Sequence, residues 1–186
     1  IQLDFIFARA GLALDMNATE PIFNTEKRIH LKQARHPLIP RKKAVPIDIR
    51  LGEDFDLLVV TGPNTGGKTV SLKTVGLLTL MGQAGLHIPA LDRSELSVFR
   101  EVYADIGDEQ SIEDDLSTYS SHLLNMKNMM KACCGTSLLL IDEFGGGTEP
   151  QIGGAIAEAV LKRFNQKKTF GIITTHYQNL KHFAED

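Results

Sequence analysis

Hydrophobic positions in the first fifty residues follow two different periods. Apolar residues first recur at helical spacing, which predicts an amphipathic helix: Leu3, Ile6, Phe7, Ala10 and Leu14. Residues 28–32 and 47–51 instead alternate between apolar and polar side chains, as half-buried strands do. Two alternating strands this early in the chain favour a small antiparallel sheet near the N-terminus.

From residue 57 onward, apolar runs alternate with helical patterns. Strands are predicted at 57–60, 98–106, 138–141 and 169–175, and helices from Thr69 to 82–85, from 116 through Met130, over 152–164 and from 179. This alternation is typical of a parallel α/β sheet with right-handed crossovers. The predicted fold class is therefore α/β, a mainly parallel sheet flanked by helices with a small antiparallel part. We expect a helix and connector over residues 1–24 and one domain over 25–186.

Composition narrows the class of protein. The 186 residues suffice for one buried core, and the net charge of −3 gives no sign of a nucleic-acid surface on this segment. No apolar run approaches the length of a membrane span, so we expect no membrane partner. Cys133 and Cys134 are adjacent in the chain and cannot form a stabilising disulfide bond with each other. This predicts reduced thiols and a cytoplasmic protein. The chain begins inside a predicted helix and stops soon after a strand, so we expect a fragment cut at both ends.

The strongest chemical signal is the glycine-rich run TGPNTGGKT at residues 61–69, which satisfies the phosphate-loop pattern. It follows an apolar strand and opens a helix, so backbone N–H groups and the positive helix end are directed at an anion. Lys68 adds a charge for the β and γ phosphates, and Thr69 adds a hydroxyl for Mg²⁺. The run predicts a nucleoside triphosphate site, with ATP as ligand, formed by Gly62, Pro63, Asn64, Thr65, Gly66, Gly67, Lys68, Thr69 and Val70.

Three further polar residues stand at the ends of predicted strands, where parallel sheets bind ligands. Asp142 can hold Mg²⁺ through water opposite Thr69, and Glu143 can orient the water that attacks the γ-phosphate or accept its proton. His176 can donate a hydrogen bond to the γ-phosphate or position the same water. Each residue also has a simpler interpretation. Asp142 could be an ordinary turn residue, Glu143 could form a salt bridge at the sheet edge, and His176 could have a structural role. Together with the phosphate loop, these residues predict a Mg²⁺-dependent ATPase.

The sequence offers no convincing arginine finger to stabilise the transition state. The helix start at Ser117 and Thr118 provides another device, because a helix N-terminus can contact phosphate. The spacing leaves open whether Ser117 serves its own ATP or that of a second subunit, and a helix cap is its commoner role.

Four motifs in this order and spacing resemble the ATPase domain of MutS proteins, which belong to the ABC-type ATPase class: TGPNTGGKT, LSTYSSHL, LLLIDEFGGGTEP and TTHYQNL. The resemblance runs from Arg35 to the end of the chain and implies a P-loop NTPase fold of ABC-ATPase type. Residues 115–119 read DLSTY where the mismatch-repair proteins show GRSTF, and Gly146 replaces an arginine. The chain is thus more similar to the second bacterial MutS lineage, which implies recombination control or rescue of collided ribosomes rather than mismatch recognition.

The resemblance also implies an obligate composite site. Two ATPase domains face each other in this family, so we expect a homodimer in which Ser117 contacts the γ-phosphate held by its partner. DNA or the ribosome would be bound by parts absent from this chain. Two alternatives remain: a nucleotide-gated clamp that binds ATP without hydrolysis, and an ABC transporter subunit. The second predicts LSGGQ where LSTY stands.

Overall fold

Buried apolar strands form the centre of the fold, as the continuous apolar runs predict. The computed structural model describes residues 1–63, 67–107, 115–145, 149–177 and 180, with only the backbone of 115–119 and 150. Its contacts divide the chain into two compact units. The first unit comprises residues 1–54 and 73–98, and the second comprises 55–72 and 99–186. The predicted division into residues 1–24 and 25–186 remains a prediction.

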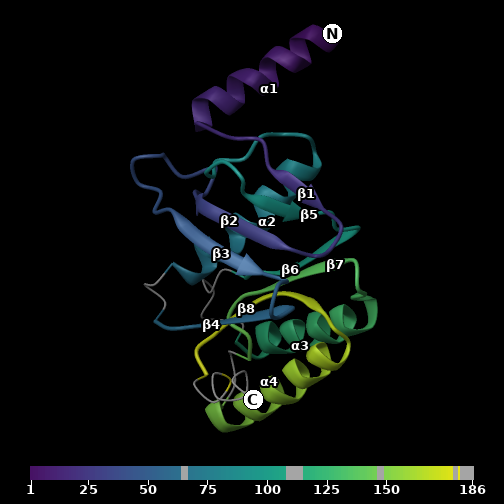
Figure 1. Ribbon diagram of the computed structural model, residues 1–186. Coiled ribbons are helices and arrows are strands. Elements are labelled where there is room, and N and C mark those ends of the chain that lie inside the picture. Colours follow the sequence, from purple (N-terminus) through teal and green to yellow (C-terminus); the bar gives the residue numbers. More distant parts are fainter. Residues whose placement is uncertain (64–66, 108–114, 146–148, 178–179, 181–186) are drawn as a thin grey trace. The chain divides into compact units, whose positions relative to one another are not determined.

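The second unit holds a parallel sheet in the order β4-β8-β7-β6 (Figure 1). Its strands are β4 (Leu57–Thr61), β6 (Glu101–Asp105), β7 (Ser137–Ile141) and β8 (Phe170–Thr175). Every residue of the central strands β7 and β8 is buried, whereas the edge strands β4 and β6 are partly exposed. This agrees with the rule that strands covered on both faces are apolar throughout.

Two helices cover one face of this sheet, α3 (Asp115–Ala132) and α4 (Pro150–Gln166) (Figure 1). Their apolar residues pack with β7 and β8 in one core, which includes Met126, Met129, Leu139, Ile141, Leu161, Phe164 and Ile173. The predicted strands of this unit and its predicted helices over 116–130 and 152–164 are therefore present. Strand 98–106 is shorter than predicted, however, since β6 begins only at Glu101. The last predicted helix lies outside the described residues except for Leu180.

The first unit holds a mixed four-stranded sheet in the order β1-β5-β2-β3. Its strands are β1 (Ile22–Asn24), β2 (Ile29–Ala34), β3 (Ile47–Leu51) and β5 (Glu95–Ser97). The two predicted strands are present as β2 and β3 and are antiparallel. Strand β5 pairs antiparallel with β2, whereas β1 and β5 form a parallel pair that the sequence pattern did not predict.

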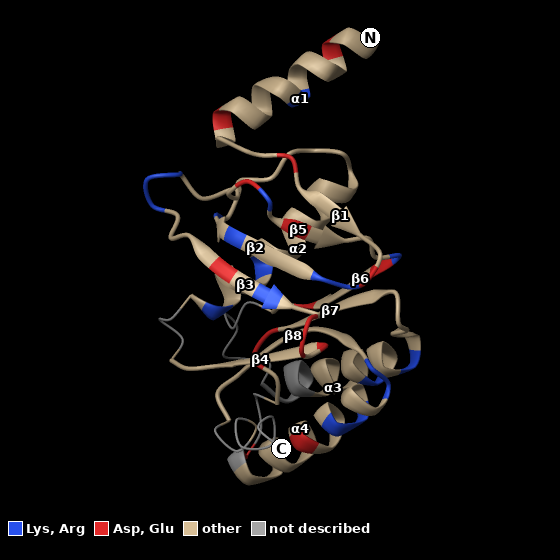
Figure 2. Cartoon of the chain, in the orientation of Figure 1, with Lys and Arg blue, Asp and Glu red and all other residues tan. Residues whose placement is uncertain are grey.

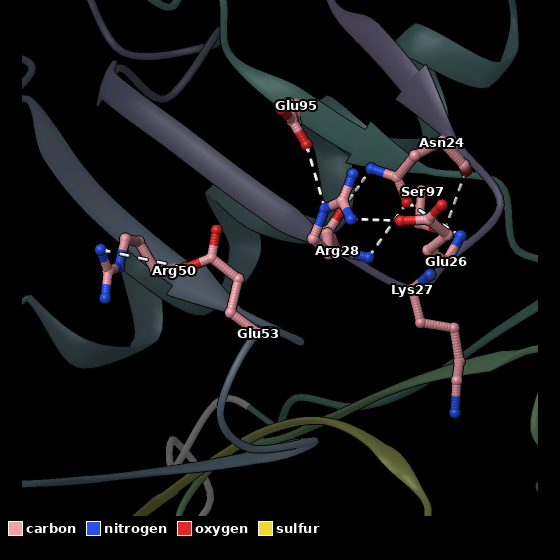
Figure 3. Close-up of polar contacts among 8 residues, drawn as sticks. All are labelled: Asn24, Glu26, Lys27, Arg28, Arg50, Glu53, Glu95 and Ser97. Carbon is pink, nitrogen blue, oxygen red and sulfur yellow. Dashed lines mark hydrogen bonds and ion pairs between the residues drawn. The ribbon is translucent and has the colours of Figure 1, made fainter.

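Polar contacts around Arg28 explain how β1 and β5 join this sheet (Figure 3). The Asn24 side-chain oxygen accepts hydrogen bonds from the backbone N–H groups of Glu26 and Arg28, each at 3.1 Å. Arg28 then pairs with Glu26 and with Glu95 of β5, which raises the pKa of its guanidinium. Because Glu95 lies 67 residues beyond Arg28 in the chain, no local sequence pattern predicts this pairing.

Helix α1 (Gln2–Met16) forms as predicted, but none of its residues is buried. Leu3, Phe7 and Leu14 are 68%, 72% and 82% exposed. The helix ends at Asn17, whose left-handed backbone lets its N–H bond to the carbonyl of Leu14.

Helix α2 (Lys68–Gln83) begins within the last two residues of the glycine-rich run. Its residues 68–72 belong to the second unit and the remainder to the first.

The basic run 41–43 lies between β2 and β3, in the loop drawn in blue in Figure 2. No helix in the described part of the chain is long and apolar enough to cross a membrane.

Candidate functional site

The strand register brings the predicted site residues of the second unit to one edge of the parallel sheet. Thr61 at the end of β4 pairs with Thr175 of β8, and Ile141 at the end of β7 pairs with Ile173. The residues that follow these strands therefore leave the sheet at its carboxyl edge. Asp142, Glu143 and His176 all lie there, next to the start of the glycine-rich loop, as ligand sites in parallel sheets do.

The glycine-rich loop adopts backbone conformations that only glycine takes readily. Gly62 and Gly67 have φ angles of 142° and 72°. Lys68 is 7% exposed, and its Nζ donates hydrogen bonds to the carbonyls of Gly62 at 2.5 Å and Pro63 at 2.9 Å. These neutral acceptors hold the ammonium at the loop without neutralising its charge. Thr69 is half-buried and Val70 exposed, while Asn64, Thr65 and Gly66 lie outside the described residues.

Asp142 is 4% exposed and is oriented by two hydrogen bonds. Its backbone N–H donates to the carbonyl of Asp105 at 2.9 Å, and its Oδ1 accepts the hydroxyl proton of Thr174. The same Thr174 oxygen accepts the N–H of Glu143 at 2.9 Å. One hydroxyl thus orients both predicted carboxylate residues. Sequence reasoning placed Thr174 in a buried strand and gave it no role; its place two residues before His176 was the available signal.

Glu143 and His176 lie against each other, as their strand-end positions predict. Glu143 Oε1 is 3.4 Å from His176 Nε2, and their side chains are 25% and 41% exposed. Glu143 has a φ of 50°, a left-handed conformation that costs a non-glycine residue about 1 kcal/mol or more. The hydrogen bond that the Glu143 N–H donates to the Thr174 hydroxyl oxygen holds this conformation. Backbone strain of this kind concentrates at functional sites.

The loop after β7 is also bonded to the end of β8. The Tyr177 hydroxyl donates to the carbonyl of Gly145 at 2.9 Å, and the Thr175 hydroxyl donates to the carbonyl of Phe144 at 2.9 Å. Gly145 has a φ of 84°, and a Cβ there would lie 2.8 Å from the Tyr177 ring. The loop carrying Glu143 is therefore fixed to the strand carrying His176, a connection that the sequence pattern did not reveal.

Thr69 and Asp142 remain the candidate metal ligands. Among the described residues, no group of three or more His, Cys, Asp or Glu side chains is placed to hold a metal ion by itself. This donor set suits Mg²⁺, which keeps several waters and binds through one or two carboxylates together with phosphate oxygens. A dedicated protein cage is not needed for such an ion.

Ser117 lies in the first turn of α3, and its side chain is outside the described residues. Its contact with a partner's γ-phosphate stays a prediction.

Both cysteines are free. Burial raises the pKa of the Cys133 thiol to about 11, whereas hydrogen bonds with Ser137 and Thr136 lower the pKa of exposed Cys134 to about 7.

Comparison with known proteins gives a family assignment. The family model of MutS domain V matches residues 58–186. Among curated proteins, the chain is 62% identical to Endonuclease MutS2 of Lachnoclostridium phytofermentans, over 98% of this chain and 23% of the relative. Endonuclease MutS2 of Agathobacter rectalis is 57% identical and that of Acetivibrio thermocellus 56%, with the same coverage. The chain thus spans about a quarter of the length of these relatives. The matched segment contains the phosphate-loop pattern and the strand-end carboxylates. The chain therefore belongs to the MutS family and carries its domain V.

Proposed function

We propose that this chain binds ATP with Mg²⁺ and hydrolyses it, as a P-loop ATPase of the ABC type. The observation that carries the proposal is the arrangement at the carboxyl edge of the parallel sheet. There a glycine-rich loop with a buried lysine, a buried carboxylate and a Glu–His pair follow three neighbouring strands. This combination of groups is typical of enzymes that transfer a phosphoryl group from a nucleotide to water.

The role proposed for Lys68 follows from its position. Its ammonium already lies at the loop, bonded to two backbone carbonyls. Charge-assisted hydrogen bonds to phosphate oxygens are stronger than bonds to neutral carbonyls, so a triphosphate displaces these contacts. Thr69 and Asp142 would hold Mg²⁺, which neutralises the charge that develops on the phosphates.

Glu143 is proposed to orient and deprotonate the attacking water. Its backbone is held by Thr174 and its carboxylate faces His176, so the side chain is directed before nucleotide arrives. Preorganisation of this kind lowers the barrier because no group must reorient during reaction. His176 is proposed to exchange part of its contact with Glu143 for a hydrogen bond to the γ-phosphate.

For the whole protein we propose a homodimer that acts on DNA, with Ser117 of each copy completing the site of the other. The name of the relatives, Endonuclease MutS2, and their greater length support this role. Recombination control is favoured over mismatch recognition because residues 115–119 depart from the mismatch-repair pattern. The family assignment argues against a transporter subunit, and Glu143 argues against a clamp that never hydrolyses ATP.

Two substitutions test this function. Lys68→Ala removes the phosphate-binding charge, so we expect ATP binding to be lost. Glu143→Gln keeps the size of the side chain but removes the base, so we expect binding to persist while turnover falls by about 10²- to 10⁴-fold. Binding is measured with a fluorescent ATP analogue and turnover by phosphate release, with and without Mg²⁺.

Matched controls come from exposed positions on the helices of the same unit. Lys127→Ala on α3 and Glu158→Gln on α4 remove the same functional groups at exposed helix positions and should leave both measurements unchanged. Equal loss of binding in Lys68→Ala and Glu143→Gln would contradict the separate roles. Turnover that continues in Glu143→Gln at the normal rate would refute the proposed base.

A further inference from the structure

Asp105 is a buried carboxylate that the proposed chemistry does not use. It is the last residue of β6, its side chain is only 8% exposed, and it belongs to the second unit. Burying a carboxylate is unfavourable unless it is paired and hydrogen-bonded. Here Oδ2 lies 2.9 Å from Nδ1 of His122, and Oδ1 accepts a hydrogen bond from Nδ2 of Asn125 at 3.2 Å. Both partners are on α3.

The same residue is bonded to the strand that carries the candidate metal ligand. Asp105 pairs with Ile141 of β7, and its backbone carbonyl accepts the N–H of Asp142 at 2.9 Å. Its main chain therefore contacts the strand end of its own ATP site, while its side chain contacts α3. The two connections are chemically separable, because substituting the side chain leaves the backbone hydrogen bond in place.

Helix α3 is the helix that carries Ser117 in its first turn. Its apolar contacts with the core come from the buried Met126 and Met129 and from the partly buried Leu123 and Met130. Apolar contacts are non-directional, whereas hydrogen bonds to a charged group fix distance and angle. His122 is five residues beyond Ser117, about 7.5 Å along the helix axis. The contacts of His122 and Asn125 with Asp105 thus add directional constraints to the apolar packing of α3.

We propose that Asp105, through His122 and Asn125, positions the start of α3 so that Ser117 reaches the γ-phosphate bound by a second copy of this chain. This inference rests on the proposed composite ATP site. The three residues are positioning residues for the partner's site rather than catalytic residues. A purely structural role would instead weaken the ATP site of the chain that carries the substitution.

Mixed dimers separate these two possibilities. A heterodimer of a His122→Ala chain and a Lys68→Ala chain contains one site with an intact phosphate loop and an unaltered α3 from the other copy. If His122 acts on the partner's site, this heterodimer recovers about half of the wild-type turnover, since one of two sites is intact. If His122 supports its own chain's site, both sites are defective and turnover stays low. Full-length chains with two different affinity tags allow the heterodimers to be isolated.

The homodimers give the second readout. We expect His122→Ala to lower turnover by about ten- to a hundredfold, the range for losing a hydrogen bond to a charged group, with ATP affinity changed less than about twofold. Asn125→Ala should act in the same direction and, being more exposed, tests the inference if His122→Ala fails to fold. His122→Asn places an amide N–H where Nδ1 lies and should restore most of the turnover. Asn128→Ala, an exposed position on the same helix, is the matched control.

Failure of this inference is distinguishable from failure of the proposed function. The reference heterodimer pairs Ser117→Ala with Lys68→Ala: its recovery upholds the composite site, and its lack of recovery contradicts that site itself. Recovery in the reference without recovery in the His122→Ala or Asn125→Ala heterodimers overturns the positioning role alone. Unchanged turnover in the His122→Ala and Asn125→Ala homodimers would overturn it as well.

Discussion

At the scale of single residues, the site depends on one hydroxyl group. Thr174 is 1% exposed and donates to the carboxylate of Asp142 while accepting the N–H of Glu143. The residues proposed as metal ligand and base, which are adjacent in the chain, are thereby oriented by a third residue on another strand. The order of β8 between β4 and β7 makes this possible, since it sets Thr174 beside the end of β7.

Thr174→Val tests this arrangement with a side chain of nearly equal size. The substitution leaves a buried carboxylate oxygen and a backbone N–H without their partner, and each such loss costs about 1–3 kcal/mol. We therefore expect lower stability in urea denaturation and slower ATP turnover. Thr79→Val is the matched control, because the buried Thr79 hydroxyl bonds only within its own helix in the contacts observed, to the carbonyl of Val75. Wild-type turnover in Thr174→Val would contradict the orienting role.

At the scale of elements, the sequence predicts the second unit better than the first. Strands β7 and β8 are continuous apolar runs, so their presence and their burial could be inferred from local pattern alone. Strands β1 and β5 have three residues each and pair across some seventy residues of chain. Strands this short do not show a recognisable alternation of apolar and polar residues. The local sequence also does not indicate which distant strand each of them pairs with.

The same limit applies inside the candidate site. The positions of Asp142, Glu143 and His176 were predictable because each lies within two residues of a strand end, and parallel strands share one carboxyl edge. Thr174, Tyr177 and Asp105 were not, because their roles depend on which strands and helices are neighbours and on side-chain direction. Chain order differs from spatial order here, with β8 lying between β4 and β7.

Strand β8 gives a prediction at this scale. Gly171 pairs with Leu57 on one side and Leu139 on the other, and a Cβ at this position would lie 2.1 Å from the carbonyl oxygen of Leu139. Backbone must move to accommodate it, so Gly171→Ala should destabilise the protein by about 3 kcal/mol or more. Gly135→Ala is the control, since nothing lies within 4 Å of a Cβ there. Denaturant midpoints that agree between the two variants would show that β8 and β7 are not held this closely.

At the scale of the whole molecule, the proposed ATP site requires two copies of the chain. In this proposal, each copy supplies the phosphate loop, Asp142 and Glu143 to one site and α3 to the other. Turnover per chain should then fall on dilution, because dimers dissociate by mass action while each copy keeps its own phosphate loop. A site complete within one chain would instead turn over at a rate per chain that is independent of concentration.

An inactive chain makes this prediction sharper. When wild-type chains are diluted until turnover falls, adding an excess of Lys68→Ala chains should raise the turnover again. The added chains hydrolyse no ATP, but they contribute α3 with Ser117 to wild-type phosphate loops. A Lys68→Ala/Ser117→Ala double variant has the same surface without the serine and should give no rise. Stimulation by both variants would mean that dimerisation alone activates the site, and stimulation by neither would mean that one chain contains all the groups that hydrolysis needs.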